Sequence, residues 1–303
     1  MATPLPGNGG SNQAPVQPAA VRTYWAAGRS FGGRGLALLG ASALASSAAT
    51  AYVRYRARTA DAGLPEEFVL EIDLALVKLV EKADASPLAL LRGDAARQVE
   101  LPALRKALEA AGKDGRVKGL LTSMASGGRE SLGGLGFAGA QEVRSAIGAF
   151  RAAAGSRAHS VAFAPAFGEG GNNGSLPYYV ACACGSVYVQ PSGLVSLTGL
   201  ESQGVFLRGL LDKIKVKPIF FTREEFKTAP NMFTETGYTA AHRSNVEELI
   251  GSLASQLLSG VAASRALPLK DVEAAMDAAP LLPGAALKAG LIDGMRYRTE
   301  HAA

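Results

Sequence analysis

The chain has 303 residues, of which 48% are hydrophobic, and this is enough to bury a substantial core in one large domain or two small ones. Its formal net charge is +5, but residues 1–60 contain six arginines and no acidic residue, which leaves 25 basic and 26 acidic residues for the rest. Because the excess positive charge does not belong to the body of the chain, the sequence predicts no nucleic-acid partner.

The composition of residues 1–34 predicts a disordered segment that resembles a transit peptide. They are at first rich in Pro, Gly, Asn, Gln and Ala, and they then carry arginines without any acidic residue. This pattern predicts import into an organelle, with the mitochondrion as the expected destination and the plastid as the alternative.

The segment 35–60 is predicted to form an apolar helix followed by a basic flank. Residues 35–53 carry no charge, and their length is close to the ~20 residues that span a bilayer. Ala, Ser and Gly dominate this stretch and weaken its transfer into lipid. A membrane anchor and an Ala-rich tether helix are therefore both open.

Residues 61–303 are predicted to form one α/β domain. Amphipathic spacing indicates helices and short apolar runs indicate strands. The expected strands are 68–73, 117–124, 160–164, 187–189 and 217–221, and the expected helices are 101–112, 138–153, 178–184, 205–214, 241–263, 271–278 and 285–289. Because the strands alternate with helices, we expect βαβ units around a mainly parallel sheet.

The sequence predicts neither a metal nor a cofactor. The two cysteines, Cys182 and Cys184, form a lone C-x-C pair, which lacks the second pair of ligands that a structural zinc needs. They are expected to pack as small hydrophobic side chains. The chain has no G-x-G-x-x-G with the downstream acidic residue of a dinucleotide site, and no G-x-x-x-x-G-K-[ST] loop.

Lys227 is the candidate base of the chain. The three histidines, His159, His242 and His301, are not near a G-x-S-x-G elbow, so a Ser-His-Asp triad is not predicted. Lys227 follows Phe226 and precedes small residues, and such neighbours could desolvate the amine and favour the neutral form that acts as a base. The competing interpretation is a lysine that snorkels over Phe226.

Between Gly119 and Tyr297, a series of fragments resembles the signal peptide peptidase A (protease IV) family of serine-lysine peptidases. The fragments are Gly133-Gly134-Leu135-Gly136, Gly139 to Arg144, Ala166 to Gly170, Tyr178-Tyr179, Gln190 to Gly193, Leu197 to Leu200, Phe206 to Lys213, Phe226 to Ala229 and Ala289 to Asp293. The resemblance implies a Clp protease/crotonase-like βαβ spiral in a single copy. It also implies hydrolysis of peptide bonds and subunits that stack into rings.

Long members of this family carry two copies of the fold, and this chain resembles the N-terminal copy, which supplies the lysine. The resemblance therefore implies that Lys227 is the general base and that the serine comes from a partner. Ser175 stands at the position of the nucleophile of the other copy, but Leu176 and Pro177 replace two glycines there and crowd it. A serine N-cap followed by a proline in the first turn explains Ser175 without catalysis.

The oxyanion donors of the family are backbone N–H groups of a glycine pair that follows the second strand. Gly133 and Gly134 fit this position better than Gly127 and Gly128, since they lie closer to the predicted helix. The proline that usually precedes the pair in active copies is missing here.

Two functions compete on this basis. The first is a peptidase subunit that acts on peptide substrates with Lys227 as base. The second is a catalytically inactive pseudo-peptidase that scaffolds a membrane-associated organellar complex. A crotonase-type acyl-CoA enzyme shares the fold, but the matching fragments are those of the peptidases. An oligomer, homomeric or mixed with a serine-bearing copy, is expected because the helices at 205–214 and 241–263 carry apolar faces beyond what one sheet can cover.

Overall fold

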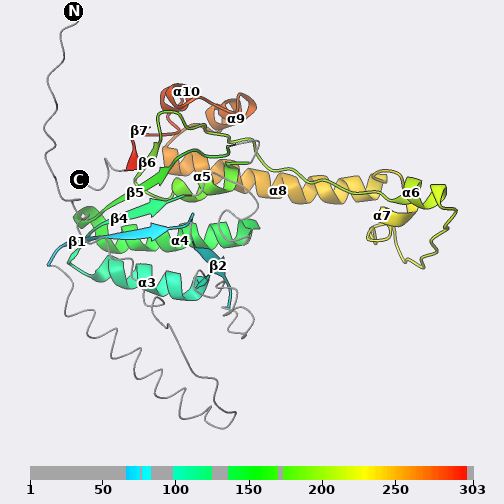
Figure 1. The fold of residues 1–303 in the computed structure, drawn as a ribbon, viewed down its shortest axis with the longest axis horizontal. Helices are drawn as coiled ribbons and strands as arrows, with labels where there is room; N and C mark the ends of the chain where they lie inside the picture. The colour runs from blue at the N-terminus through cyan, green and yellow to red at the C-terminus, as the bar shows by residue number, and fades with distance from the viewer. Residues whose placement is uncertain (1–65, 76, 83–97, 125–135, 170–172, 299–303) are drawn as a thin grey trace, which may run out of the picture.

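The computed structural model describes residues 66–75, 77–82, 98–124, 136–169 and 173–298, which form an α/β body with a long projecting arm (Figure 1). The main sheet has five parallel strands in the order β1 (Phe68–Asp73), β4 (Val117–Ser123), β5 (His159–Ala164), β6 (Ser186–Val189) and β7 (Gly294–Met295). Strands β2 (Lys78–Val80) and β3 (Gln98–Glu100) form a separate parallel pair. The α/β class with a parallel sheet, as predicted, is confirmed.

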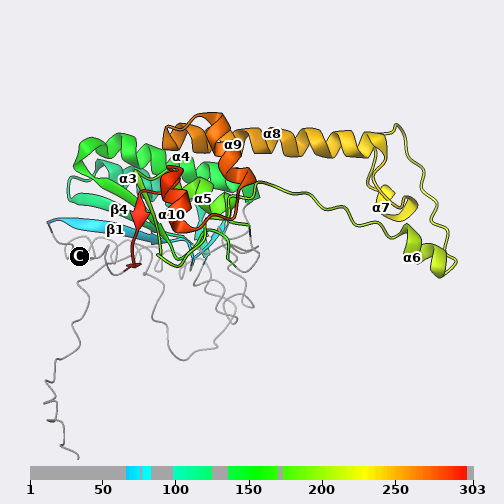
Figure 2. The same ribbon diagram turned by 90° about the horizontal axis from the view of Figure 1, so that it is seen from above.

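Helices α3 (Leu101–Lys113) and α4 (Gly136–Ala154) cover one face of the main sheet (Figure 2). Their apolar side chains recur every three or four residues, so each helix buries a continuous stripe against the strands. The buried stripes consist of Leu101, Leu104 and Leu108 in α3 and of Val143, Ile147 and Phe150 in α4. The two helices predicted in this part of the chain are confirmed within three residues at each end.

Three further helices complete the body. Helix α5 (Ser175–Ala181) follows β5 and is almost wholly buried, whereas α9 (Leu269–Asp277) and α10 (Pro283–Lys288) are partly exposed. Asp293, which lies between α10 and β7, links β6 and α8 (Ala240–Arg265) through hydrogen bonds. The backbone N–H of Val187 donates to Asp293, and Arg265 forms a bidentate ion pair with the same carboxylate.

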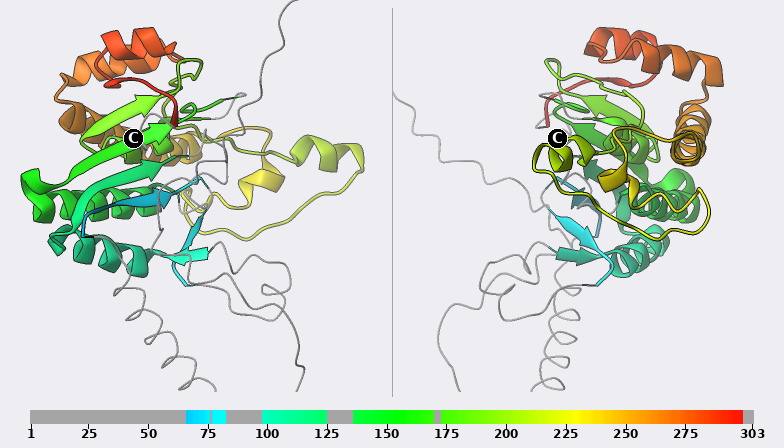
Figure 3. Two further views of the ribbon diagram at one scale, coloured as in Figure 1. Left: turned by 60° about the vertical axis from the view of Figure 1, so that its left-hand side comes forward. Right: turned by 90° about the vertical axis from the view of Figure 1, so that its right-hand side faces the viewer.

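The arm is built on α8 (Ala240–Arg265), and its tip carries the short helices α6 (Arg208–Lys213) and α7 (Asn231–Thr234) (Figures 1 and 3). The 26 residues of α8 correspond to about 39 Å of helix. Its buried residues are Leu257, Val261 and Ala262, all in the last third. The body therefore holds α8 only by its C-terminal end, and the rest of the helix projects.

The base of the arm rests on the ring of Tyr179 in α5. A Cβ atom at Gly260 would lie 2.4 Å from Cε2 of this ring, so only a glycine lets α8 approach so closely. The guanidinium of Arg144 lies 4.1 Å from the centre of the same ring and donates hydrogen bonds to the carbonyl oxygens of Tyr179 and Gly260 and to the Oγ atom of Ser264. One arginine thus joins α4, α5 and α8.

The arm departs from the sequence-based expectations in two places. The helix expected at 205–214 covers only Arg208–Lys213, and the strand expected at 217–221 does not form. Residues 217–221 have no regular secondary structure, because a strand needs a neighbour to accept its backbone hydrogen bonds. At the tip of the arm, the described part of the chain offers no strand to pair with.

Within the described residues, no helix is long and apolar enough to cross a membrane. The predicted transit-peptide-like segment 1–34 and the apolar segment 35–60 lie outside the described residues.

We predict that Gly260→Ala loosens the arm from the body. The added methyl group would overlap the Tyr179 ring, and such overpacking costs about 1–3 kcal/mol of unfolding free energy. Gly251→Ala, on the projecting part of α8 with nothing within 4 Å of the new Cβ, is the matched control and should raise stability by up to ~1 kcal/mol. Urea denaturation midpoints measure both, and equal effects of the two variants would refute the close contact.

We also predict that Asp293 stabilises the fold to an extent that depends on pH. Burial by itself raises the pKa of its carboxyl, but the hydrogen bonds from Arg265 and from the Val187 N–H outweigh burial and hold the pKa below its usual value of 3.8. A lowered folded-state pKa contributes stability that is present above the unfolded value and is lost as the pH falls through the folded value.

At pH 7, Asp293→Asn should therefore lower the unfolding free energy by about 1–2 kcal/mol, a figure reduced because the carboxylate is partly exposed. The difference between wild type and variant should shrink below pH 4. Urea titrations of both proteins at several pH values test this, and a difference independent of pH would contradict the assignment.

Candidate active site

Ser175 lies inside the body at the start of α5, after the carboxyl end of β5. Its side chain is fully buried, and its Oγ atom accepts a hydrogen bond of 2.9 Å from the Gly199 N–H. Asn173 braces the same contact from the other side, because its Oδ1 accepts from the Ser175 N–H and its Nδ2 donates to the Gly199 oxygen, both at 2.7 Å. The hydroxyl of Ser175 thus holds two loops together.

The N-cap of α5 is Gly174, so the expectation that Ser175 caps the helix is wrong by one residue. A Cβ at position 174 would lie 2.3 Å from the carbonyl carbon of Phe167, which explains why this N-cap is a glycine. Helix α5 begins at Ser175, whose Oγ accepts from the Gly199 N–H in the loop network and does not cap the helix end.

Ser196 extends this network. Its Oγ donates to the Gly168 oxygen at 2.7 Å, and its own carbonyl accepts from the Gly174 N–H at 3.1 Å. Gly168 and Gly199 both have a positive φ, near 80°, which suits glycine and lets the loops turn sharply around the serine. The buried polar groups are thus arranged to close this region, and within the described residues the side chain of Ser175 is not exposed to solvent.

Lys227 lies at the tip of the arm, in the loop between α6 and α7. Its side chain is exposed, and so are the side chains of Glu224 and Glu225. Phe221 is 99% exposed and Phe226 is 57% exposed. The expected desolvation of Lys227 by its own phenylalanines does not occur within this chain, because a tip without a second layer of structure leaves those rings in solvent.

The structure does not bring Lys227 and Ser175 together. The twenty residues of α8 between Ala240 and Gly260 hold the tip roughly 30 Å from the place where α8 meets α5. Because α8 is a continuous helix, the arm cannot fold back onto its own body. A dyad between these two residues of one chain is excluded in this conformation.

Two further sets of residues were singled out from the sequence, the glycine pairs and the two cysteines. Gly133 and Gly134, the predicted oxyanion donors, lie outside the described residues, as do Gly127 and Gly128. Cys182 and Cys184 are buried as expected, and burial raises the pKa of Cys182 to about 11 and that of Cys184 to about 12. Both thiols stay protonated at neutral pH and act as packing groups.

Sequence reasoning missed the residues that give the site its shape. Asn173 and Arg144 position the loops and the arm. Arg144 ends one of the family fragments, but nothing in that fragment predicts its contacts with Tyr179, Gly260 and Ser264. The Asn-x-Ser spacing at 173–175 is the one local signal, because an Asn side chain often accepts a hydrogen bond from the backbone N–H two residues later.

The fold and the positions of Ser175 and Lys227 indicate the class of protein. An α/β body with a parallel sheet and Ser175 at its carboxyl edge fits the Clp protease/crotonase-like class predicted from the sequence. Residues 169–303, which include both Ser175 and Lys227, match the model of Peptidase family S49. The predicted resemblance to the signal peptide peptidase A family is thereby confirmed for this part of the chain.

Two curated proteins that this chain resembles in sequence are peptidases, in agreement with this match. Protease 4 of Salmonella typhi is 30% identical over 131 residues, which cover 43% of this chain and 19% of that protein. The chloroplastic serine protease SPPA of Arabidopsis thaliana is 27% identical over 127 residues, again 19% of its length. The chain therefore spans about a fifth of the length of the curated relatives it matches.

Among solved structures, an enoyl-CoA hydratase/isomerase family protein from Silicibacter pomeroyi covers 70% of this chain at 19% identity, and an enoyl-CoA hydratase from Mycobacterium avium subsp. paratuberculosis covers 72% at 16% identity. Both alignments have a TM-score of 0.24 and carry no argument about function.

We predict that Ser175→Ala destabilises the fold by about 1–3 kcal/mol, because the buried Gly199 N–H would lose its acceptor. Ser202→Ala, an exposed serine nearby in the sequence, should change stability by less than ~0.5 kcal/mol. Thermal unfolding of the two variants distinguishes them. If Ser175→Ala instead left stability intact and removed labelling by a fluorophosphonate, Ser175 would be a nucleophile and not a structural residue.

Proposed function

We propose that this chain is a serine-peptidase subunit that supplies Lys227 as general base to a serine carried by a partner subunit. The single observation that supports this most is the position of Lys227. It lies exposed at the tip of an arm that cannot reach its own body, whereas Ser175 is closed inside the body by Gly199 and Asn173. Such an arrangement suits a base that acts on another molecule.

The apolar side chains of the arm support docking to a partner. Large exposed apolar patches on a protein surface mark interaction sites. The large apolar side chains that are exposed between residue 220 and the end of α8 are Phe220, Phe221, Phe226, Met232 and Leu249. Docking of this surface would bury the rings beside Lys227 and remove water from its amine, which favours the neutral form.

The chemistry then follows the serine-lysine scheme. The neutral Nζ of Lys227 takes the proton from the partner's serine as the serine oxygen attacks the peptide carbonyl, and it returns the proton to the leaving amine. A glycine pair such as Gly133 and Gly134 would donate N–H groups to the oxyanion. Glu224 and Glu225 must stay in solvent during docking, since a nearby carboxylate would hold the amine in its charged form.

A second function, a non-catalytic scaffold, is favoured by the burial of Ser175 and by the crowding that Leu176 and Pro177 impose on it. In this case the arm serves assembly alone. A fluorophosphonate probe applied to the purified assembly separates the two functions, because it labels an activated serine on any subunit and leaves a scaffold unlabelled.

We also propose an organellar location. The acid-free, arginine-bearing residues 1–60 support it, and the chloroplastic location in the name of the Arabidopsis thaliana relative favours the plastid. The mitochondrion, expected from the sequence, stays a prediction, as does the membrane anchor at 35–53.

We predict that Lys227→Met lowers peptide hydrolysis by the assembly about 100-fold or more, because loss of a general base typically costs 10²–10⁴-fold. Lys270→Met, an exposed lysine on α9 in the body, is the control and should hydrolyse peptide at the wild-type rate. Light scattering on the same samples reports whether each variant still assembles. Unchanged hydrolysis by an assembled Lys227→Met protein would show that Lys227 is not the base.

A further inference from the structure

The direction in which the arm leaves the body depends on few contacts. Helix α8 buries Leu257, Val261 and Ala262, and apolar burial is non-directional, so it holds the helix on the body without fixing the angle at which it leaves. The other connection to the tip, residues 201–206, has no regular secondary structure and does not stiffen the arm. The angle of α8 is therefore set by the hydrogen bonds at its base, which are directional.

Two arginines make charged hydrogen bonds of this kind. Arg265, the last residue of α8, donates to the carboxylate of Asp293. Arg144 of α4 donates to the Gly260 oxygen at 3.1 Å and to the Ser264 Oγ atom at 2.9 Å. A helix that is held at one point can tilt about it, whereas a helix that is held at two points has a fixed direction. Arg144 supplies the second point.

The guanidinium of Arg144 is itself fixed to the body. It lies 4.1 Å from the centre of the Tyr179 ring and donates a hydrogen bond to the carbonyl oxygen of the same residue. Hydrogen bonds from a charged donor are stronger than neutral ones, and the planar fork that makes several of them at once is a property of arginine that a lysine ammonium cannot reproduce. The Arg144 side chain is therefore a rigid link between α5 and α8.

One further hydrogen bond joins α4 and α8, but it is weaker. Nε2 of Gln141 donates to Oε1 of Gln256 at 2.8 Å in an exposed position. Both partners are neutral and flexible, and each can bond to water instead, so the net contribution of this bond is small. Its position is informative, because Gln141 and Arg144 lie three residues apart on one face of α4 and meet residues spaced by four on one face of α8.

A small shift at the base of the arm becomes a large shift at its tip. Along α8, Gly260 lies five residues from Arg265 and Ala240 lies twenty-five, so the helix multiplies a displacement about fivefold. A shift of Gly260 by roughly 0.5 Å relative to Arg265 would move Ala240 by roughly 2.5 Å. Misplacement of a reacting group by about 1 Å can cost 100-fold in rate. The hydrogen bonds of Arg144 therefore matter far from the residues that they join.

The tip of the arm follows α8 because contacts within the tip join it to the start of this helix. The Leu207 N–H donates to the Met232 oxygen at 2.6 Å and so links the segment before α6 to α7. The rings of Phe206 and Tyr238 pack edge to face with 5.1 Å between their centres, just before α8 begins. A tilt of α8 is thus passed on to α6 and α7.

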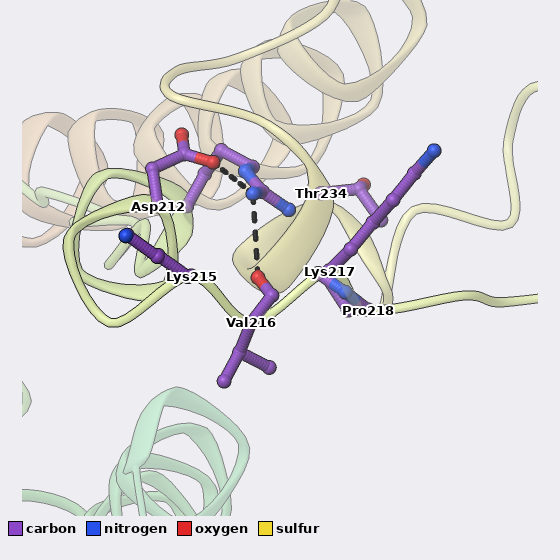
Figure 4. A pocket seen from close by; sticks show the side chains of 7 residues that line it. Asp212, Lys215, Val216, Lys217, Pro218 and Thr234 are labelled. Atoms are coloured by element: carbon purple, nitrogen blue, oxygen red, sulfur yellow. Dashed lines mark hydrogen bonds and ion pairs between the residues drawn. The ribbon is translucent and has the colours of Figure 1, made fainter.

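The loop that carries Lys227 is held to the same tip. At its beginning, Arg208 of α6 donates to the Val216 oxygen, as a dashed line in Figure 4 shows. Further along, the Phe220 ring stacks on the Phe233 ring of α7 with 5.8 Å between their centres. Lys227 therefore moves with the arm, and the direction of α8 determines where its amine lies.

We propose that Arg144 is a positioning residue of the peptidase reaction. It does not touch the reacting atoms, but it fixes the direction of the arm and with it the place at which Nζ of Lys227 meets the serine of the partner subunit. This inference rests on the proposed role of Lys227 as general base. An arm of fixed direction is preorganised for docking, because little freedom is left to lose when it meets the partner.

The first measurement follows the direction of the arm in the full chain. Spin labels at Leu210→Cys on α6 and at Leu282→Cys on the body, both exposed positions, report the distance between tip and body by double electron–electron resonance. Cys182 and Cys184 are buried and protonated and should stay unlabelled. Dilution with unlabelled chain ensures that each measured pair lies in one molecule. With Arg144 in place, we expect a single narrow distribution of distances.

Arg144→Lys should broaden this distribution and lower kcat of the assembly about 10- to 100-fold with KM unchanged, because the base acts in the transition state and does not hold the substrate. Arg151→Lys is the matched control, since Arg151 lies on the same helix and donates to the Ala183 oxygen at 2.8 Å, within the body. It should leave the distribution and kcat as in wild type. A quenched fluorescent peptide gives both constants, at concentrations where light scattering shows full assembly.

Ser264→Ala is a milder variant that tests the same link should Arg144→Lys fail to fold. It removes one acceptor of the Arg144 guanidinium from an exposed position on α8 and leaves the body unchanged. We expect a smaller broadening and a fall in kcat of roughly threefold. Ser255→Ala is its control, because the Ser255 hydroxyl donates to the Gly251 oxygen within α8 itself.

A crosslink separates positioning from any other effect of Arg144. Gln141→Cys and Gln256→Cys, at side chains that meet in the wild-type protein, can be joined by a short bismaleimide and would tie α4 to α8 without the arginine. In the Arg144→Lys protein, this crosslink should restore the narrow distribution and most of kcat.

Three results would overturn the inference. An unchanged distance distribution in Arg144→Lys would show that other contacts fix the arm. A broadened distribution with wild-type kcat would show that the partner subunit places Lys227. A crosslink that restores the distribution without kcat would show that Arg144 acts by another route. A wild-type assembly that hydrolyses no peptide would instead overturn the proposed role of Lys227, and the distance distributions would still decide whether Arg144 fixes the arm.

Discussion

The contact between the Tyr179 ring and Gly260 determines how the rest of this molecule is arranged. It is the point at which α8 meets the body, and it works because glycine lets the helix backbone lie directly on an aromatic ring. Arg144 reinforces it by stacking on the ring and by bonding to the carbonyl oxygens on both sides. Because the contact lies near the C-terminal end of α8, the body holds the helix at that end only. The rest of α8, together with α6 and α7, projects away from the body.

A consequence of this arrangement is that the two residues most suited to peptidase chemistry are kept apart. Ser175 is a buried member of a loop network, whereas Lys227 is exposed at the end of a rigid helix. Neither has the environment that catalysis needs within one chain, because a base must lose water and a nucleophile must be accessible. Under the proposed function, a catalytic site would be completed only by association of subunits, and assembly and activity would then be one equilibrium.

The arm also separates two kinds of surface that short sequence fragments do not distinguish. The loop that contains Phe221, Phe226 and Lys227 is aromatic, whereas the segment around Lys215 alternates cations with aliphatic residues. The loop carries charges of both signs, with Arg223 and Lys227 beside Glu224 and Glu225, whereas the segment around Lys215 adds three lysines to a single internal ion pair. The physical difference lies in the cost of burying several charges of one sign without partners.

The sequence by itself determined the alternation of strands and helices, the apolar stripes of α3 and α4 and the burial of Cys182 and Cys184, since local periodicity and composition decide these. The family fragments likewise pointed to a peptidase, whereas the role of Lys227 as a base stays a prediction, because the desolvation expected from its immediate neighbours does not occur within this chain. Only the tertiary structure decided where Lys227 lies relative to Ser175, that Ser175 is closed by Gly199, and that no strand forms at 217–221. Each of these depends on contacts between residues distant in the chain, and a local pattern does not encode the direction in which a long helix leaves its body.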